Sequence, residues 1–542
     1  MRVSTNDYPL LRFPRERAAI VTETAQRAFD AVLARSAPEY ILNDTCLNEI
    51  RRLSEGAAQE EVRSLGEWRR LWRSLGGLAR PQLQEELQKL VRGYAEDVAG
   101  GFNQPVYRVA TTLLPPALGL LLTPERLGQL APHLMHPSRL VALLNQRMQV
   151  AGPLERLRAL SQRATLVCVP THLSNLDSPV MGYALQVAGL PPSTYGAGKN
   201  LFTNPVLGFF MRNLGAYRVD RRIRHDLYKD VLKTYSQVIL ERGYHSMFFP
   251  GGTRSRSGRV ESHLKLGLLG TAMTASIERF RRMAGAAPGP AIRPLYIVPV
   301  TINMQLVLEA ETLIADHLKE TGKARFIIDD DESTQLGRMV QFVRSTVTHA
   351  GAVVIRFGDP IDVMGNPVDE AGRSIGPHGG EIDISRYFLV RKGGQLVPQV
   401  VPQRDAEYMN DTGHAISQRY RRETVLMATH LLASVVWRYI ELMLPGLDLY
   451  RRLRQPLDLQ LEIPAVLADI ERLQAQLRAR GHHLGPYAAG TPQEVLSAAL
   501  AAFKSYHSEP AVLRTSDNTI APGDRQLILY YQNRVESLGV SP

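Results

Sequence analysis

The amino-acid sequence predicts an α/β fold with helical regions at both ends. Between about residues 160 and 357, short apolar segments typical of strands alternate with amphipathic segments typical of helices. A stretch rich in Gly and Pro over 359–405 predicts long loops. We therefore expect an N-terminal helical domain over 1–155, an α/β domain over 156–405 and a C-terminal helical region over 406–542.

The individual elements follow from the spacing of the apolar residues. In the first part, helical periodicity predicts helices over 16–34, 60–75 and 82–99. In the last part, the same periodicity predicts helices over 414–444 and 470–480. Short apolar runs in the middle part predict strands over 166–169, 216–219, 246–249, 292–300 and 352–357.

Length and cysteine content limit the class of protein. The chain has 542 residues, of which 44% are hydrophobic, and this is enough for a large core and two or three domains. Its only cysteines, Cys46 and Cys168, lie far apart in the sequence, and Cys168 falls within a predicted strand. A disulfide framework or a thiolate metal site is therefore not expected, and no metal is predicted. This cysteine usage fits a reducing cytoplasm.

The sequence lacks the signals of export and of membrane spanning. Residues 1–9 have neither the charged start nor the apolar run of a secretory signal, so we expect a protein that is not exported. The longest apolar stretches, 109–123 and 425–436, are shorter than the roughly 20 residues that cross a bilayer. We interpret both as buried helices, and the alternative is that they lie in a membrane interface.

The net charge favours an anionic partner. A formal charge of +11 and a pI near 9.6 suit nucleic acid, an acidic carrier protein, a phosphorylated substrate or a membrane surface. The densest basic cluster, 212–224, lies close in sequence to the candidate catalytic segment described below, which favours a phosphorylated substrate. No known nucleic-acid-binding motif is present, so nucleic acid is not expected.

A His followed five residues later by an Asp, His172 and Asp177, comes directly after a predicted strand. A side chain at the end of a buried strand points into the crevice above an α/β sheet, where substrates bind. A short loop brings the Asp to one imidazole nitrogen, which fixes the tautomer and leaves the other nitrogen to act as a base. We predict that His172 is the catalytic base.

Two further copies of this spacing occur in the chain, and their context differs. His225 and Asp230 lie in a segment that we interpret as continuous helix over 224–241, in which residues five apart do not face each other. We expect this copy on the surface. His378 lies in a Gly- and Pro-rich turn with no preceding strand, and we interpret it as part of a mobile loop.

Two other segments carry groups suited to binding an anion. Lys199 follows Gly196-Ala197-Gly198, where an ammonium beside small residues suits phosphate, although a solvated Lys is an equally good interpretation. The segment 248–259 runs from a predicted strand into a turn with two glycines, and it lacks the order of a Walker loop. This turn predicts an anion site formed by Gly252, Thr253, Arg254, Ser255 and Arg256.

Four blocks together resemble the glycerol-phosphate acyltransferases and their relatives that share a His-x-x-x-x-Asp motif. The first block is 172–177, the second 208–212, the third 249–255 and the fourth 298–300, all in the family's order. The resemblance covers about residues 160–360. It implies a central mixed sheet flanked by helices, and transfer of a fatty acyl group from coenzyme A or acyl carrier protein to a glycerol-phosphate hydroxyl.

The resemblance also implies roles for individual residues. His172 would be the general base oriented by Asp177, while Lys199, Arg212 and Arg254 would hold the acceptor phosphate. The strand 298–300 would border the acyl site. No covalent enzyme intermediate is implied, in agreement with the lack of a Gly-x-Ser-x-Gly motif near the His. Acyl-CoA or acyl carrier protein would be a co-substrate, and no other cofactor is expected.

The length of the chain favours an unacylated acceptor, glycerol 3-phosphate or dihydroxyacetone phosphate, because family members that acylate an already acylated acceptor are usually shorter. The second block is equally similar to the branch that acylates 1-acylglycerol 3-phosphate, which stays the alternative. Because the product is a lipid, we expect peripheral attachment to the cytoplasmic face of the inner membrane through an anionic surface.

One position departs from the family. The third block usually has the sequence Phe-Pro-Glu-Gly-Thr-Arg, and this chain has Gly251 where the Glu belongs. Three explanations remain open: another acceptor, a carboxylate supplied from elsewhere such as Glu261, or reduced activity. The departure also allows a protein without catalytic activity that binds anionic membranes or nucleic acid through the basic turn.

Overall fold

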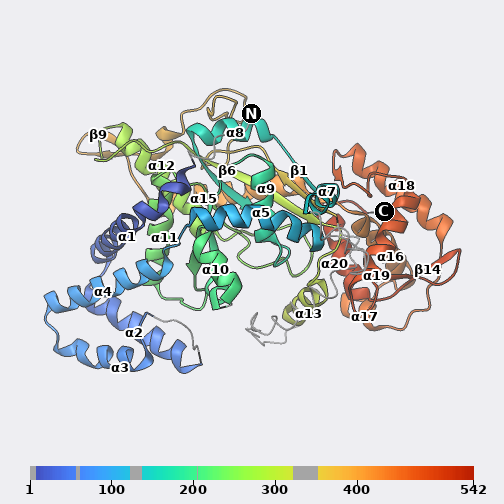
Figure 1. The fold of residues 1–542 in the computed structure, drawn as a ribbon, viewed down its shortest axis with the longest axis horizontal. Helices are drawn as coiled ribbons and strands as arrows, with labels where there is room; N and C mark the ends of the chain where they lie inside the picture. Colours follow the sequence, from blue (N-terminus) through green and yellow to red (C-terminus); the bar gives the residue numbers. More distant parts are fainter. Residues whose placement is uncertain (1–7, 57–61, 122–136, 204, 322–351, 542) are drawn as a thin grey trace.

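A seven-stranded mixed sheet lies at the centre of the molecule (Figure 1). The computed structural model describes residues 8–56, 62–121, 137–203, 205–321 and 352–541. The strand order is β1-β7-β6-β2-β5-β3-β4, and all neighbours are parallel except β6 and β7. The strands are β1 (Met148–Ala151), β2 (Thr165–Pro170), β3 (Thr194–Gly198), β4 (Ala216–Val219), β5 (Ser246–Met247), β6 (Leu295–Met304) and β7 (Val353–Phe357). The predicted α/β class with a mixed central sheet is confirmed.

Five of these strands match predicted ones, and two were missed. β1 lies within the part predicted to be wholly helical, where it pairs with β7. Its sequence, Met-Gln-Val-Ala, is too short to show a clear period. β3 has the sequence Thr-Tyr-Gly-Ala-Gly, and two glycines in five residues give it a low strand propensity. Its position in the sheet outweighs this low propensity.

Both faces of the sheet are covered by helices. On β2, Leu166 and Cys168 pack into a core that contains residues of α8 and α9. The alternate residues Val167 and Val169 pack into a second core with residues of α11, α12 and α15. This burial on both faces explains why the strand is a continuous apolar run. These helices are α8 (Leu154–Arg163), α9 (Asp177–Val187), α11 (Asp226–Glu241), α12 (Leu266–Met283) and α15 (Pro402–Glu423).

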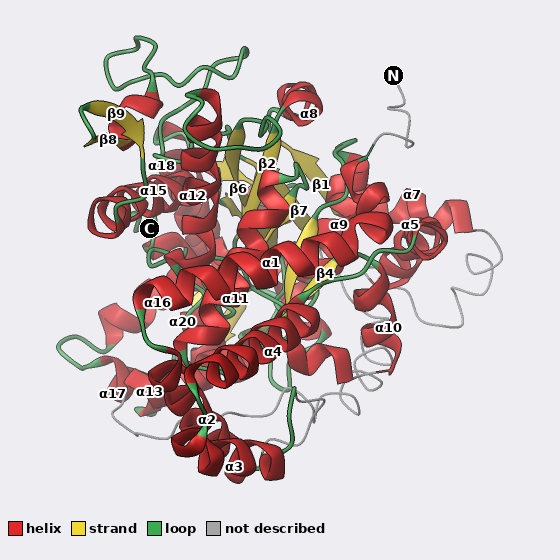
Figure 2. Cartoon of the chain, turned by 90° about the vertical axis from the view of Figure 1, so that its left-hand side faces the viewer, coloured by secondary structure: helices red, strands yellow, loops and turns green. Residues whose placement is uncertain are grey.

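The N-terminal helices lie against α11, on one side of the sheet. Figure 2 shows α1 and α4 in front of α11 and the strands. A third core joins buried residues of these helices, such as Trp68 and Leu87, to Val231 and Tyr235 of α11. The predicted helices over 16–34 and 82–99 are confirmed, whereas the one over 60–75 begins later, at Leu65. The helices are α1 (Phe13–Arg35), α2 (Pro38–Ser54), α3 (Leu65–Ser74), α4 (Arg80–Val98), α5 (Gln104–Leu121) and α7 (Pro137–Arg147).

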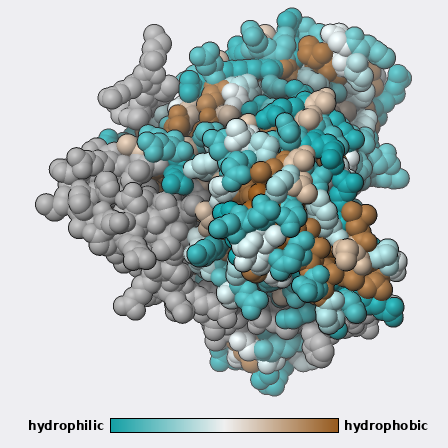
Figure 3. Space-filling view, turned by 90° about the vertical axis from the view of Figure 1, so that its right-hand side faces the viewer, coloured by the Kyte–Doolittle hydropathy of each residue, from teal (hydrophilic) through white to brown (hydrophobic). Residues whose placement is uncertain are grey.

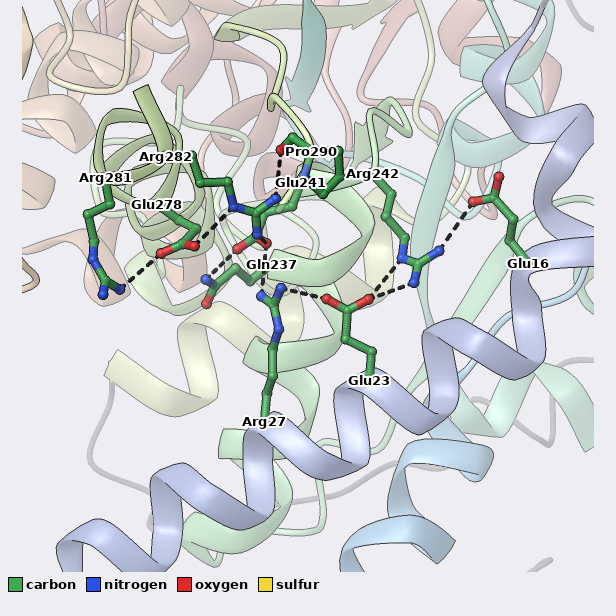
Figure 4. Close-up of polar contacts among 10 residues, drawn as sticks. All are labelled: Glu16, Glu23, Arg27, Gln237, Glu241, Arg242, Glu278, Arg281, Arg282 and Pro290. Carbon is green, nitrogen blue, oxygen red and sulfur yellow. Dashed lines mark hydrogen bonds and ion pairs between the residues drawn. The ribbon is translucent and has the colours of Figure 1, made fainter. Parts of the chain in front are cut away.

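A network of ion pairs fixes α1 to the sheet-covering helices (Figure 4). Glu241 of α11 lies at its centre, with a side chain that is 3% exposed. It pairs with Arg27 of α1 at 2.8 Å and with Arg282 of α12 at 3.0 Å. Arg242 extends the network back to α1, where it pairs with Glu23 at 2.6 Å. Three helices that are distant in sequence are therefore joined by charge as well as by apolar packing.

The C-terminal part is helical, as predicted, and packs beside the sheet (Figure 1). The predicted helix over 414–444 is interrupted, because Val425 and Leu426 form a short strand, β10, that pairs with β12 (His483–Leu484). Figure 3 shows that the outer face of this part is mainly hydrophilic, with separate apolar areas. Its helices are α16 (Ala428–Met443), α17 (Leu449–Arg454), α18 (Ile463–Ala479), α19 (Pro492–Ser505) and α20 (Arg525–Glu536).

The Gly- and Pro-rich stretch 359–405 is mostly loop, as predicted, but it also holds a hairpin that was not predicted. The hairpin strands are β8 (Leu389–Lys392) and β9 (Gln395–Pro398). The remaining elements are short: α10 (Pro205–Asn213), α13 (Ala310–Thr321), β11 (Leu461–Glu462), β13 (Val512–Arg514) and β14 (Thr519–Pro522).

The two long apolar stretches differ in their environment. Residues 425–436 are buried, as predicted. In the stretch 109–123, of which 122 and 123 lie outside the described residues, Val109 is 51% and Leu113 is 57% exposed, so the interpretation as a buried helix is wrong there. Among the described residues, no helix combines the length and the apolarity that crossing a membrane requires.

Candidate active site

His172 lies at the carboxyl edge of the sheet, immediately beyond the end of β2. All six residues of β2 are buried, so the end of the strand is fixed by the packing around it. The backbone N–H of Thr171 donates to the carbonyl of Val300 on β6 and extends the strand pairing by one residue. The chain then leaves the sheet, and Asp177 begins α9. The apolar strand therefore delivers the His to the crevice where ligands of open α/β sheets bind.

His172 and Asp177 form a closely held pair. Nδ1 of His172 lies 2.7 Å from Oδ2 of Asp177. The same oxygen accepts the backbone N–H of Leu173 at 2.6 Å and of Ser174 at 3.0 Å. Because a carboxylate oxygen that accepts three bonds is an acceptor only, Nδ1 carries the proton. Nε2 is then the basic nitrogen, and it has no hydrogen-bond partner among the described residues.

The imidazole is also held from its face. Its ring stacks on Phe249 from the segment after β5, with 4.2 Å between ring centroids and 24° between ring planes. The His172 side chain is 16% exposed, whereas that of Asp177 is fully buried. The base therefore keeps limited access to solvent, while the carboxylate that orients it is shielded.

The segment 249–261 holds the backbone of His172 on both sides. The N–H of Ser255 donates to the carbonyl of His172 at 2.8 Å. The N–H of His172 donates to Oε1 of Glu261 at 2.7 Å. Both backbone groups of the candidate base are thus bound by this segment: Ser255 belongs to the predicted anion site, and Glu261 follows it in the sequence.

The predicted anion site lies partly beside His172. Gly252 has φ +74°, a left-handed conformation that suits Gly, and Thr253 follows it in the same turn. Arg254 lies next to the His172 loop, because Glu309 contacts both of them. The carboxylate of Glu309 accepts Ser174 Oγ at 2.9 Å and pairs with Arg254 at 3.5 Å. Arg256 pairs with Glu320 of α13, and Ser255 Oγ bonds to the carbonyl of Arg259.

Lys199 and Arg212 form a separate group on the same edge of the sheet. Lys199 follows β3, which is separated from β2 by β5, so about 10 Å lie between their strand ends. Its ammonium is 5% exposed and pairs with Asp97 of α4 at 3.0 Å. Arg212 donates to the carbonyl of Phe202, in the turn that contains Lys199, at 3.2 Å. An acceptor phosphate at this place would have to compete with Asp97.

Three groups near His172 had no assigned role in the sequence analysis: Glu309, Tyr530 and Arg534. Glu309 belongs to a loop after β6, and its link to the His172 loop depends on the packing of α13. Arg534 and Tyr530 come from α20, almost at the end of the described chain, and both are buried. No local pattern relates α20 to a strand so distant in sequence, so only the tertiary structure brings these groups together.

The ionisation of Glu261 is strongly perturbed. Burial raises the pKa of Glu261 to about 7, although the bond from His172 and the charge of Arg534 lower it, and Asp177 raises it further. Burial also raises the pKa of the Cys168 thiol on β2 to about 12. That thiol is therefore neutral at physiological pH and unsuited to act as a nucleophile.

The second copy of the motif corrects one prediction. His225 is not on the surface: it caps the N-terminus of α11 and is 3% exposed. Its Nε2 lies 3.3 Å from Glu49 and 3.2 Å from the hydroxyl of Tyr94. The helix begins one residue after His225, so the expected continuous helix over 224–241 starts too early. His378 lies in a turn, exposed, as predicted.

The described residues hold no group of three or more His, Cys, Asp or Glu side chains arranged for a metal ion. Both cysteines are free and buried.

Comparison with known proteins relates the central part of the chain to one family. Residues 153–303 match a family model described as Acyltransferase. This range runs from the turn before α8 into β6, and so contains His172, Asp177 and the 249–261 segment. This match supports the family predicted from the four sequence blocks.

Curated relatives and one solved structure also match. The glycerol-3-phosphate acyltransferase of Pseudomonas paraeruginosa (strain DSM 24068 / PA7) is 27% identical over 279 residues, which are 51% of this chain and 28% of the relative. That of Ectopseudomonas mendocina is 24% identical and covers 49% and 27%, respectively. The chain thus spans little more than a quarter of the length of these relatives. The crystal structure of the 1-acyl-sn-glycerophosphate (LPA) acyltransferase PlsC from Thermotoga maritima is 16% identical, covers 43% of this chain and 68% of that chain, and gives a TM-score of 0.23.

Proposed function

We propose that this chain, whose residues 153–303 belong to the acyltransferase family, transfers a fatty acyl group from a thioester to the hydroxyl of glycerol 3-phosphate. The observation that carries the proposal is the His172–Asp177 pair at the carboxyl edge of the sheet, with Arg254 beside its loop. A base next to a cation is what an alcohol with an anionic end requires. The names of the curated relatives favour the same acceptor.

In the proposed reaction, Nε2 of His172 removes the proton from the acceptor hydroxyl as its oxygen attacks the thioester carbonyl. Asp177, bonded to Nδ1, stabilises the imidazolium that forms. The tetrahedral intermediate then expels the thiolate, which takes the proton from His172, and an ester and a free thiol result. No side chain is acylated, so the buried thiol of Cys168 has no part in the reaction.

The acceptor phosphate is proposed to bind Arg254 and the turn of Gly252 and Thr253. Glu309 holds Arg254 in this structure, and a phosphate, with more negative charge, would displace that carboxylate from the guanidinium. Lys199 and Arg212, about two strand spacings from His172, would meet the phosphate only if the acceptor extends toward β3. We assign coenzyme A or acyl carrier protein as donor, and no further cofactor.

The proposal is tested by offering the purified protein radiolabelled acyl-CoA with three acceptors in parallel: sn-glycerol 3-phosphate, dihydroxyacetone phosphate and 1-acylglycerol 3-phosphate. We expect the highest kcat/KM with glycerol 3-phosphate. A higher value with 1-acylglycerol 3-phosphate would favour the alternative acceptor. Absence of label in all three, with acyl-CoA and with acyl carrier protein as donors, would contradict the proposed function.

A peripheral association with anionic membranes is proposed for release of the lipid product. It is supported by the charge of +11 and by apolar side chains on adjacent helices: Val109 and Leu113 of α5, and Phe209 of α10, are each at least half exposed. Flotation with anionic liposomes tests it. Binding should weaken at high salt and in Leu113→Asp, and no binding at low salt would contradict it.

A further inference from the structure

The absence of a side chain at Gly251 has a specific structural partner. A Cβ atom built at Gly251 would lie 2.6 Å from Oε2 and 2.8 Å from Cδ of Glu261. Both separations are shorter than real Cβ contacts. The φ angle of Gly251 is not in the left-handed region, so its backbone does not require Gly. A side chain at position 251 would therefore require the Glu261 carboxylate to move.

Glu261 reaches this space from ten residues further along the chain and binds the candidate base. Oε1 accepts the backbone N–H of His172 at 2.7 Å, while Oε2 is buried without a hydrogen-bond partner among the described residues. A buried oxygen without a partner is costly, and structures keep such groups where function requires them. Oε2 is such an oxygen and lies beside the His172 loop, which points to a role for Glu261 in the reaction.

Arg534 offsets part of the cost of ionising Glu261. Arg534 of α20 is 2% exposed, and it donates to the carbonyl of Ile302 at 3.4 Å. Its positive charge acts on both Glu261 and Asp177, the two buried carboxylates that bind the His172 loop. Arg534 thus interacts electrostatically with both carboxylates that bind the His172 loop, and the C-terminal part of the chain supplies this cation.

We propose that Glu261 is a positioning residue that takes the place of the family's missing carboxylate, and that Gly251 and Glu261 are a coupled pair. This rests on the proposed function. Glu261 does not reach the reacting atoms: it acts through His172, whose backbone it holds against the loop that contains Arg254. Because a side chain at position 251 would begin in the space that the Glu261 carboxylate fills, a Glu at 251 and the Glu at 261 would compete for that space.

The test is a double-mutant cycle with Gly251→Glu, Glu261→Ala and the exchange variant that carries both. Each single change should lower kcat by about 10²-fold, because the base is misplaced, with a smaller effect on KM. Gly251→Glu brings two carboxylates into one cavity, and Glu261→Ala leaves none. The exchange variant restores a single carboxylate and should recover at least about ten-fold of kcat relative to either single variant. His263→Ala, an exposed change in the same loop, is the matched control and should leave kcat unchanged.

A second readout does not depend on activity. Hydrogen exchange of the backbone segment 171–177 should be faster in Glu261→Ala than in the unmodified protein, because the His172 N–H loses its acceptor, and it should be unchanged in His263→Ala. Thermal unfolding identifies any variant that does not fold. Glu261→Gln, which keeps an acceptor oxygen and loses the charge, separates the hydrogen bond from the charge: slow exchange with low kcat assigns the role to the charge.

The proposal is overturned if Glu261→Ala keeps full kcat and slow exchange at 171–177. It is also overturned if the fold-loss of kcat in the exchange variant equals the product of the fold-losses in the two single variants. These outcomes differ from a failure of the proposed function, in which the unmodified protein acylates no glycerol phosphate while Glu261→Ala still speeds exchange at His172.

Discussion

Nδ1 of His172 lies 2.7 Å from Oδ2 of Asp177, and the same oxygen also accepts hydrogen bonds from two backbone N–H groups. Asp177 is also the first residue of α9, where the helix dipole favours a negative charge. The carboxylate therefore fixes both the loop and the imidazole tautomer. In the proposed reaction, its charge would stabilise the imidazolium of His172.

Asp177→Asn keeps the shape and removes the charge. We expect kcat to fall by about 10³-fold, because the amide favours the tautomer with the proton on Nε2, while KM changes little. Steady-state kinetics with labelled acyl-CoA measure this. Asp226→Asn is the matched control, since Asp226 also lies in the first turn of a helix but is 78% exposed, and it should have no effect. Equal kcat in Asp177→Asn and Asp226→Asn would exclude the role assigned to Asp177.

The two His-x-x-x-x-Asp copies should separate activity from stability. His225→Ala removes a buried ring bonded to Glu49 and Tyr94, and should lower the free energy of unfolding by about 2 to 3 kcal/mol while leaving the activity of the folded fraction unchanged. His172→Ala should lower the activity of the folded protein while leaving the free energy of unfolding nearly unchanged. Urea unfolding and kinetics on both variants check this, and loss of activity in folded His225→Ala would contradict the assignment.

Glu241 should be the most sensitive residue of the network in Figure 4. Glu241→Gln leaves Arg27 and Arg282 without their shared carboxylate, and Arg282 is 9% exposed. We expect the free energy of unfolding to fall by about 3 kcal/mol, from urea midpoints at constant slope. Glu85→Gln, which breaks an exposed pair with Lys89, should lower it far less. Similar losses in both variants would refute the special position of Glu241.

Glu261 should make the protein less stable as the pH rises. Its pKa in the folded protein, about 7, lies above the ordinary value of 4.5. The folded state therefore binds the proton more tightly, so the contribution of Glu261 to stability is complete below pH 4.5 and is lost as the pH rises to about 7. The groups that act on it are the His172 N–H, Arg534 and Asp177, and Glu261 in turn acts on Tyr420.

Glu261→Gln removes this dependence. At pH 8 it should be more stable than the unmodified protein by as much as about 3 kcal/mol, and the difference should vanish near pH 4. Urea unfolding of both proteins from pH 4 to pH 8 measures it, with Glu85→Gln as an exposed control. A difference that does not change with pH would show that Glu261 titrates normally.

The parts of the fold that were predicted correctly depend on local pattern. β2 is a run of six buried residues, and α1 and α4 have clear helical periods. The errors come from elements that the tertiary structure imposes. β3 contains two glycines and owes its conformation to its neighbours in the sheet, and Val425 leaves the expected helix because it pairs with His483.

The site divides in the same way. His172 and Asp177 are five residues apart, so a motif placed after a strand is enough to predict their pairing. Arg534 of α20 acts electrostatically on Asp177 and Glu261, and no sequence pattern links α20 to them. Glu261 lies between these cases: the departure at Gly251 suggests a carboxylate from elsewhere, with Glu261 as one possibility, and the geometry places the Glu261 carboxylate directly beside Gly251.

The most direct test of the central claim is the transfer of label from acyl-CoA to sn-glycerol 3-phosphate by the unmodified protein and by His172→Ala, with both shown to be folded by thermal unfolding. We predict a labelled acylglycerol phosphate with the unmodified protein and a rate lower by more than about 10²-fold with His172→Ala. Undiminished turnover in folded His172→Ala would contradict the account.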